Sequence, residues 1–417
     1  MLPIFSKMAM LLFLLCSVQA FGQEMDLDLP DPLSNHGKAV DTKQDWQKHR
    51  RPAILESFQT QVYGQVPQKD VSVSFIVDQE NPQALCSQAH SKSVTVLFSN
   101  SQDTVSMHLM LYLPKANQPV PVFVGLNFYG NHTVHFDADI PISKSWAPNN
   151  PQFCIFDNQL DHLSRGVRAH RWPIERIIER GYGLAAIYSG DLDPDYDDGF
   201  QNGIHPLFYD RDQNQPKADE WGTIGAWAWG LSRALDYFEQ DAAVDEKRVA
   251  VIGHSRMGKA ALWAGAQDER FALVVSNDSG CGGAAISRRK SGETVKAINT
   301  QFPHWFCKNF HQYNEKEEKL PVDQHLLISL IAPRPVYVAS AEQDSWADPV
   351  GEYLSLYYAA PVFHLFGHST NLPKDQPKVN EPLQQGPLGY HVRTGAHDIT
   401  RYDWERYLDF ADQHLKK

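Results

Sequence analysis

The stretch from Val249 to Gly265 constrains the fold of this chain more than any other part of the sequence. It opens with the apolar run VAVI, which is rich in β-branched residues and typical of a strand buried on both faces. A tight turn with the sequence GHSRMG follows, and the run KAALWA after it favours a helix. A serine at the apex of a strand–turn–helix unit is typical of a nucleophile elbow, so the sequence predicts Ser255 as a nucleophile.

The turn around Ser255 departs from the general elbow pattern at one position. Such turns need small residues beside the crowded serine, and Gly253 supplies the first of them. The common motif has its second glycine two residues after the serine, where this chain has Met257, and Gly258 follows one residue later. A strand–turn–helix unit with an incidental serine is therefore the alternative interpretation of this stretch.

The 417-residue chain has the composition of a globular protein, with 42% hydrophobic and 21% charged residues. Within residues 1–20, Lys7 precedes the apolar run MAMLLFLL, and VQA ends the segment, which predicts a secretory signal peptide and an exported, periplasmic or secreted protein. No later apolar run has the length of a membrane span, so we expect no membrane partner. The net charge of −12 argues against nucleic-acid binding, which depends on positive charge.

Apolar and alternating runs predict a series of strands separated by helices. The first three strands are expected to pair antiparallel, at residues 71–77, 93–98 and 105–113. Later strands alternate with helices, which predicts an α/β-hydrolase fold, with a doubly wound, mostly parallel sheet in a three-layer sandwich. These strands are expected at residues 119–126, 182–188, 249–252, 271–276, 335–341 and 361–366, and helices at 46–63, 172–180, 221–238 and 400–415.

We expect one domain after the leader. Residues 21–45 are aperiodic and predict a flexible lead-in, and no repeat or linker divides residues 46–417, which predicts a single α/β-hydrolase catalytic domain. Four cysteines follow residue 20, and in an exported protein either a disulfide or buried free thiols would suit them. The sequence leaves that choice open for Cys86, Cys154, Cys281 and Cys307.

A serine nucleophile needs a base that accepts its proton and an acid that orients the base. In α/β hydrolases both follow the serine in the chain. Two aspartates follow predicted strands and qualify as the acid: Asp344 after 335–341, the usual place, and Asp278 after 271–276. Sequence order alone does not choose the base among His364, His368, His391 and His397.

The oxyanion of an acyl-transfer reaction needs nearby donors. The backbone N–H of Arg256 is one expected donor, the loop near 127–130 is expected to supply another, and the Arg256 guanidinium adds positive charge. A surface salt bridge is the alternative role for Arg256. The run DLDPDYDDG at 191–199 resembles a calcium loop, but Asn202 stands where the bidentate glutamate would be. We interpret it as a solvated acidic loop and predict no metal and no cofactor.

Three segments together resemble one known family. They are Gly253-x-Ser255-Arg256-x-Gly258-Lys259, Asp278-Ser279-Gly280-Cys281-Gly282-Gly283 and Gly395-x-His397. The set is similar to the glucuronoyl esterases, carbohydrate esterase family 15, of bacterial type, and the likeness extends from about Trp46 to the C-terminus. The displaced glycine at 258 is this family's own pattern.

The resemblance implies a serine carboxylesterase that hydrolyses esters of 4-O-methyl-glucuronic acid, as in lignin–glucuronoxylan cross-links. An acetylxylan esterase on the same fold is the alternative, and an inactive carbohydrate-binding hydrolase fold is a third. The resemblance assigns the nucleophile to Ser255, the base to His397 and oxyanion stabilisation to Arg256.

The resemblance also implies substrate-binding residues. Lys259 and Gln301 would bind sugar hydroxyls, and Trp346 would lie over the uronate, with core packing as its alternative role. The family varies in the acid: many members have a glutamate where this chain has Asp278, and other bacterial members use the position of Asp344. We favour Asp344, and expect a monomer acting on a glucuronoxylan or lignin–carbohydrate ester.

Overall fold

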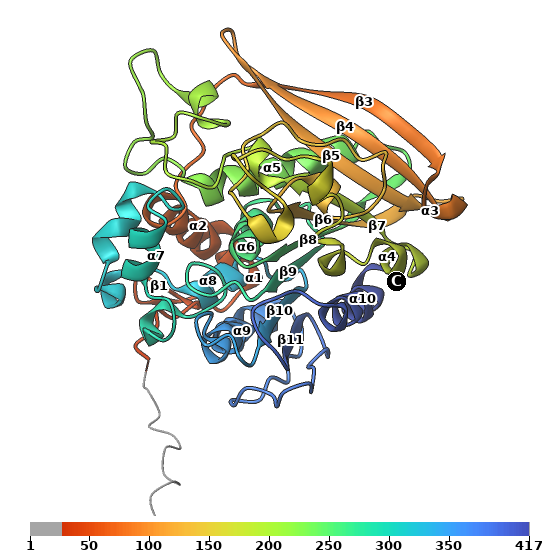
Figure 1. Cartoon of the computed structure of the whole chain (residues 1–417). Helices are drawn as coiled ribbons and strands as arrows, with labels where there is room; N and C mark the ends of the chain where they lie inside the picture. The colour runs from red at the N-terminus through yellow and green to blue at the C-terminus, as the bar shows by residue number, and fades with distance from the viewer. Residues whose placement is uncertain (1–26, 417) are drawn as a thin grey trace, which may run out of the picture.

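The structure is a computed structural model that describes residues 27–416, so the predicted signal peptide at 1–20 lies outside the described residues. A nine-stranded sheet runs through its centre, and helices cover both faces (Figure 1). The strands are β3 (Ser72–Gln83), β4 (Ala89–Ser99), β5 (Thr104–Pro114), β6 (Val120–Asn127), β7 (Gly183–Tyr188), β8 (Val244–His254), β9 (Leu273–Asn277), β10 (Val336–Ala341) and β11 (Leu388–Arg393).

The order of the strands across the sheet is β11-β10-β9-β8-β6-β7-β5-β4-β3. The strands from β11 to β7 are parallel to their neighbours, whereas β5, β4 and β3 continue the sheet antiparallel. Parallel strands need crossover connections, and the long segments between them supply these. The predicted mostly parallel sheet with an antiparallel front end is confirmed.

Two helical layers enclose the sheet and complete the predicted three-layer sandwich. One layer shares a buried apolar cluster with its face of the sheet and contains α2 (Arg51–Gln61), α5 (Thr223–Phe238), α6 (Arg256–Gln267), α8 (Gln324–Ser329) and α9 (Pro349–Leu365). The opposite layer contains α4 (Ile174–Glu179) and α10 (Arg401–Leu415). The remaining α- and π-helical segments of the described residues are α1 (Lys43–Asp45), a π-helix (Trp46–Arg50), α3 (Ala84–Ser87) and α7 (Val295–Gln301).

The strand predicted at 361–366 is wrong, because these residues end helix α9 and turn away from it. The buried residues Tyr353, Leu356, Ala360 and Phe363 recur at helical spacing, but a short apolar window does not reveal that period. The last strand is instead β11, whose LGYHVR sequence is interrupted by polar side chains that are nevertheless buried. Their partner is on α10, so only tertiary contacts make this segment a strand.

The described part of the predicted flexible lead-in, residues 27–45, is folded against the domain. It contains the small ribbon of β1 (Ser34–Asn35) and β2 (Lys38–Ala39), and Val40 is buried. Arg50 donates to the carbonyls of Asp31 and Pro32. These contacts place residues 27–45 against the domain, and the flexibility of this segment stays a prediction.

The four cysteines within residues 27–416 are free thiols in the structure. Cys86 is exposed and Cys154 is partly exposed, while Cys281 and Cys307 are buried. Of the two alternatives, the structure therefore contains the free thiols. Within residues 27–416, no helix combines the length and apolar character that crossing a membrane requires.

Candidate active site

The turn between β8 and α6 places Ser255 in a strained backbone conformation, with φ 58° and ψ −129°. Strain of this kind at a non-glycine residue is typical of functional sites. A Cβ on Gly253 would collide with the carbonyl of Met257, and a Cβ on Gly258 would lie 2.9 Å from Cβ of Ser279. The displaced glycine therefore has a physical reason: position 258, and not the buried Met257, faces the loop after β9.

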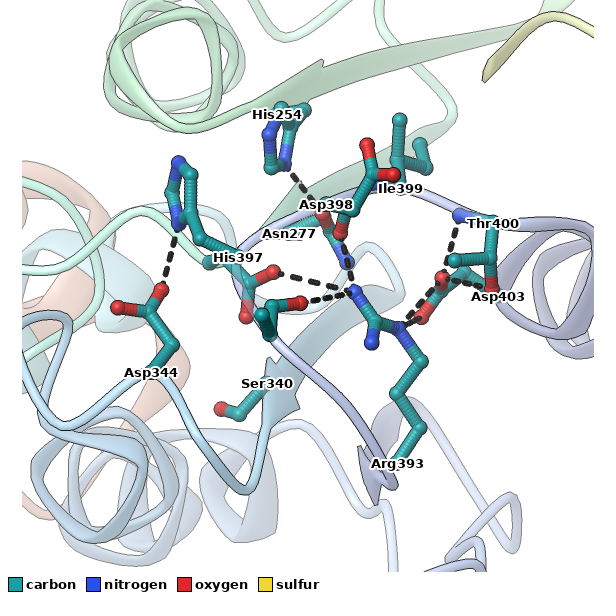
Figure 2. Close-up of polar contacts among 12 residues, drawn as sticks. His254, Asn277, Ser340, Asp344, Arg393, His397, Asp398, Ile399, Thr400 and Asp403 are labelled. Carbon is teal, nitrogen blue, oxygen red and sulfur yellow. Dashed lines mark hydrogen bonds and ion pairs between the residues drawn. The ribbon is translucent and has the colours of Figure 1, made fainter. Parts of the chain in front are cut away.

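His397 lies beside this turn and is bonded to Asp344. Its Nδ1 is 2.5 Å from Oδ2 of Asp344, whose side chain is buried (Figure 2). The ring of His397 is 4.6 Å from that of His254, the residue that immediately precedes Ser255. Burial lowers the pKa of His254 well below its ordinary value, so this neighbour adds no positive charge beside His397. The structure thus brings the predicted base and the favoured acid together, beside the turn that carries Ser255.

Asp278 lies close to the same pair but does not contact the imidazole by a hydrogen bond. It follows β9 with φ 45°, is buried, and neither of its carboxyl oxygens has a hydrogen-bond partner within residues 27–416. Burial raises its pKa well above the ordinary value, and the nearby Glu352 adds to this, against the opposing effect of Arg393. Burial therefore disfavours the ionised form of Asp278, which is the form that would stabilise an imidazolium.

Sequence reasoning missed Glu352, which lies on α9 and is fully buried behind the two aspartates. Its Oε1 accepts from the backbone N–H groups of Ser279 and Gly280, and its Oε2 accepts from Ser340 Oγ. The carboxyl group therefore joins the loop after β9 to the end of β10, the two places that carry Asp278 and Asp344. Burial raises the pKa of Glu352 to about 7, although these hydrogen bonds lower it.

Arg393 at the end of β11 holds the loop that carries His397. Its guanidinium donates to the carboxylate of Asp403 and to the carbonyl of Asp398 (Figure 2). It also donates to the carbonyls of Thr394 and Ala396. Several bonds to one planar group fix the loop's path, which is how arginine acts as a rigid fork. No pattern in the sequence separates this arginine from an ordinary surface one.

The other candidate bases lie elsewhere. His391 is buried on β11 and bonded to Asp403 at 2.8 Å. His364 lies on the exposed side of α9, where its ring meets Thr370, and His368 follows the end of that helix. Of the four histidines, only His397 meets either candidate acid.

Arg256 begins α6 and points to a cluster of aromatic rings. Its guanidinium forms an ion pair with Asp195 and lies 4.7 Å from the ring of Trp305 and 5.2 Å from that of Phe302. The pair is partly buried, so it differs from the surface salt bridge weighed as an alternative. The carboxylate of Asp195 balances the charge of Arg256 and, together with the aromatic rings, holds its side chain next to the turn of Ser255. The guanidinium remains partly exposed.

The acidic run at 191–199 is solvated, as we expected, only in its second half, where Asp197 is exposed. Asp191 and Asp193 are buried, and Asp195 accepts hydrogen bonds from Trp305 Nε1 and pairs with His304. Burial alone would raise the pKa of Asp195, but Arg256 and these donors lower it to about 2. The expectation fails for the first half because the partners of these carboxylates lie far away in the sequence.

Lys259 is buried one helical turn after Ser255. Its ammonium donates to the carbonyls of Ser279 at 2.7 Å and Cys281 at 2.5 Å, and lies 3.6 Å from Glu293. An ammonium has three donors, and these contacts use most of them. Lys259 therefore fixes the loop after β9, and its contact with a sugar hydroxyl stays a prediction.

Trp346 and Gln301 lie at the rim of the site. Trp346 is 53% exposed, which excludes the alternative role in core packing. Its backbone carbonyl accepts from the N–H of Glu293, which fixes the loop after β10. Gln301 ends α7 with an exposed side chain beside Phe302. Both predicted substrate contacts stay predictions.

One group of side chains within residues 27–416 is compact enough to share a metal ion. The ligand atoms of Asp278, Asp344 and His397 lie within 4.8 Å of one another. Two of the three already bond to each other, so the same atoms suit proton transfer without a metal.

Comparison with known proteins agrees with this geometry. The family model described as fungal glucuronyl esterase matches residues 205–367. A carbohydrate esterase of an unknown prokaryotic organism is 50% identical over 389 residues, which cover 93% of this chain and 89% of that protein. A 4-O-methyl-glucuronoyl methylesterase of Podospora anserina is 28% identical over 84% of this chain and 62% of its own length.

Solved structures are similar over the same range. A promiscuous family 15 esterase from a marine bacterial metagenome has a TM-score of 0.87 and 50% identity, covering 93% of this chain and 97% of that one. A glucuronoyl esterase from Solibacter usitatus has a TM-score of 0.87 and 45% identity with the same coverage. The chain therefore belongs to carbohydrate esterase family 15, the glucuronoyl esterases.

Proposed function

We propose that this protein hydrolyses esters of 4-O-methyl-glucuronic acid, including those that join glucuronoxylan to lignin alcohols. The observation that carries the proposal is the bond from His397 to Asp344 beside the strained Ser255, with Arg256 at the first turn of the next helix. Relatives named for this activity support the choice of substrate. None of the relatives reported above is named an acetylxylan esterase, so that alternative lacks support.

The first chemical step is attack by Ser255 Oγ on the ester carbonyl. In our proposal, Nε2 of His397 accepts the hydroxyl proton, and the charge on Asp344 stabilises the resulting imidazolium. The oxygen of the tetrahedral intermediate lies near the backbone N–H and the guanidinium of Arg256, where positive charge is worth more than in water.

The intermediate then collapses and the alcohol leaves with the proton from His397. This forms an ester between Ser255 and the uronate carbonyl. Water, deprotonated by the same imidazole, hydrolyses that ester and releases the free uronic acid. The exposed ring face of Trp346 would lie against the pyranose, and Gln301 would bind its hydroxyls.

We also propose that the protein is exported, on the basis of the leader sequence at residues 1–20, and that it acts as a monomer. The N-terminal sequence of the mature protein and its mass in solution test these two points.

A substrate panel tests the activity. We expect kcat/KM for benzyl glucuronate to exceed that for acetylated xylan and for p-nitrophenyl acetate, because uronates offer hydroxyls and a ring face to Gln301 and Trp346. A larger value on acetylated xylan would replace the proposal by the acetyl esterase alternative. Absence of hydrolysis on all three would leave only the inactive carbohydrate-binding protein.

A further inference from the structure

A separate cavity of about 520 Å³ lies between the antiparallel strands and the segment that follows β6. Its floor is the face of β4 and β5 opposite the main core, and residues 139–145 cover it. The volume falls within the range of known ligand pockets. Neither the nucleophile nor any other predicted site residue lines it, so the proposed reaction does not account for it.

A buried aspartate fixes a histidine in this cavity. Nδ1 of His108 is 2.9 Å from Oδ2 of Asp191, and the Asp191 side chain has no exposure. Asp191 also accepts from the hydroxyls of Ser143 and Ser145, which lie on the covering segment. Through Asp191, these bonds connect the covering segment, residues 139–145, to His108 on the floor of the cavity. The ring of His108 is half-exposed, and its Nε2 remains available to a ligand.

The strand register places this cavity at the same edge of the sheet as the nucleophile. Asn127 on β6 pairs with Tyr188 on β7. The register of β6 with β8 places His254 beside Asn127, and the register of β7 with β5 places His108 beside Tyr188, so the four residues form one row across the sheet. The row crosses β8, β6, β7 and β5, which lie side by side in Figure 1. Three strand spacings separate His254 from His108, a lateral distance of about 14 Å.

A chain of hydrogen bonds also connects the two places. The side chain of Asn131 donates to the backbone carbonyl of His108 at 2.9 Å. Its amide oxygen accepts from the side chain of Asn127 at 2.7 Å. Asn127 ends β6 and begins the loop in which we expect the second oxyanion donor, so the cavity wall and that loop share a fixed backbone.

The chemistry of the walls suits a saccharide. Short hydroxyls line the floor at Ser91, Ser93 and Ser106, His108 adds a ring nitrogen, and the exposed Lys144 adds an ammonium at the rim. Apolar atoms of Met110 and Ile140 lie between these polar groups. Pyranoses present alternating hydroxyl and C–H surfaces. An aromatic alcohol in the same place would cover the hydroxyls of Ser91, Ser93 and Ser106 and Nε2 of His108 without offering them hydrogen-bond partners, which is costly.

We propose that this cavity is a remote subsite that binds sugar residues of the xylan chain while the uronate ester lies at Ser255. The inference rests on the proposed function, because it requires a polymeric substrate with its ester at the nucleophile. Binding energy from such a remote contact helps to orient the reacting ester, so it raises kcat/KM only for substrates long enough to reach it.

The test fills the cavity with a tyrosine. Ser106→Tyr places a ring among the floor hydroxyls, and Thr104→Tyr, on the same strand but exposed and outside the cavity, is the matched control. Each change is made in the active enzyme and in the Ser255→Ala protein, and thermal unfolding checks that all variants fold. Titration calorimetry with xylohexaose measures binding to the Ser255→Ala proteins.

We expect Ser106→Tyr to weaken xylohexaose binding by about tenfold and to lower kcat/KM by about tenfold on a uronate ester carried by a xylo-oligosaccharide. Benzyl glucuronate, which is too short to reach the cavity, should react at an unchanged rate, and Thr104→Tyr should change nothing. Unchanged binding of xylohexaose, or equal losses on the long and the short ester, would overturn the subsite. Failure of the wild-type enzyme on benzyl glucuronate would instead overturn the proposed function, and the binding measurement would still report on the cavity.

Discussion

Two histidine–aspartate pairs lie at the same edge of the sheet, and they are built alike. In each, Nδ1 of the imidazole meets a buried carboxylate, at 2.5 Å for His397 with Asp344 and at 2.9 Å for His108 with Asp191. The two histidine side chains are equally exposed, at 42% and 43%. A well-formed pair is therefore not enough to identify a catalytic base.

The surroundings of the two pairs differ in what can react. The ring of His397 lies against His254, whose neighbour Ser255 is held in a strained turn, and Arg256 brings a positive charge. Near His108, the hydroxyls of Ser143 and Ser145 donate to Asp191, and none of the serines that line this cavity has a positive φ. In our proposal, the strained serine beside His397, rather than the histidine–aspartate pair itself, distinguishes the first site.

Removing the nucleophile should have the largest effect. Ser255→Ala is expected to lower kcat on benzyl glucuronate by about 10⁴–10⁶-fold, as in other serine hydrolases, while the fold is kept. His108→Gln is the matched change at the other pair and should leave this small ester's kcat/KM within about twofold, because the reaction does not use that imidazole. Steady-state kinetics measure both. A Ser255→Ala enzyme with more than a tenth of the wild-type rate would contradict the assignment.

Neutralising the acid should have the next largest effect. Asp344→Asn removes the charge beside His397 and favours the wrong tautomer, so we expect kcat to fall by at least two decades, as much as about 10⁴-fold. Asp278→Asn should cost less, because Asp278 makes no hydrogen bond to His397 and burial disfavours its ionised form.

The ranking of these two variants is the critical measurement. A larger loss for Asp278→Asn would move the acid to the loop after β9, and equal moderate losses would mean that both carboxyls share the role. If neither change slows the enzyme tenfold, some other group orients His397.

Removing the positive charge expected beside the oxyanion should have the third-largest effect on kcat. Arg256→Gln is expected to lower kcat by about 10²–10³-fold with a smaller change in KM, because the guanidinium interacts most strongly with charge that develops in the transition state. Arg176→Gln is the control, since that arginine pairs with Glu405 between α4 and α10, away from the nucleophile. A loss confined to KM would show that Arg256 binds the uronate in the ground state instead.

Much of this site could be predicted because its chemistry is local in the sequence. The elbow is one strand, one turn and one helix, so Ser255, Arg256 and the compensating Gly258 stand together in the chain. The sheet also follows from apolar runs whose strands are buried on both faces, as with β6 and β7. These features need no knowledge of distant contacts.

The parts that could not be predicted depend on partners far away in the chain. β11 carries the buried His391 and Arg393. The carboxylate of Asp403, on the next helix, forms hydrogen bonds with both side chains and balances the charge of the arginine. The acidic run looked solvated because the partners of Asp195 lie 61 and 109 residues later, at Arg256 and His304. Polar residues of this kind look exposed until the fold supplies their partners.

We expect the smallest effect on kcat from a change at Glu352. This residue marks a further difference between the two histidine–aspartate pairs. A second buried carboxyl lies behind Asp344, whereas serine hydroxyls surround Asp191. Glu352→Gln keeps an acceptor for the backbone N–H groups of Ser279 and Gly280, and its amide can donate to Ser340. We therefore expect a folded enzyme with only a few-fold loss of kcat at neutral pH.

The variant's main signature should be in stability against pH. Burial raises the pKa of Glu352 from about 4.5 in the unfolded chain to about 7 in the folded protein, so the folded state binds more protons between these values. Stability should consequently fall as pH rises from about 4.5 to 7, by an amount on the order of 1–3 kcal/mol. Glu352→Gln cannot ionise and should lose this part of the slope. Urea unfolding at pH 5 and pH 8 measures the free energy of unfolding of the wild-type protein and of Glu352→Gln. If this free energy changes by the same amount in both proteins, Glu352 does not titrate in this range.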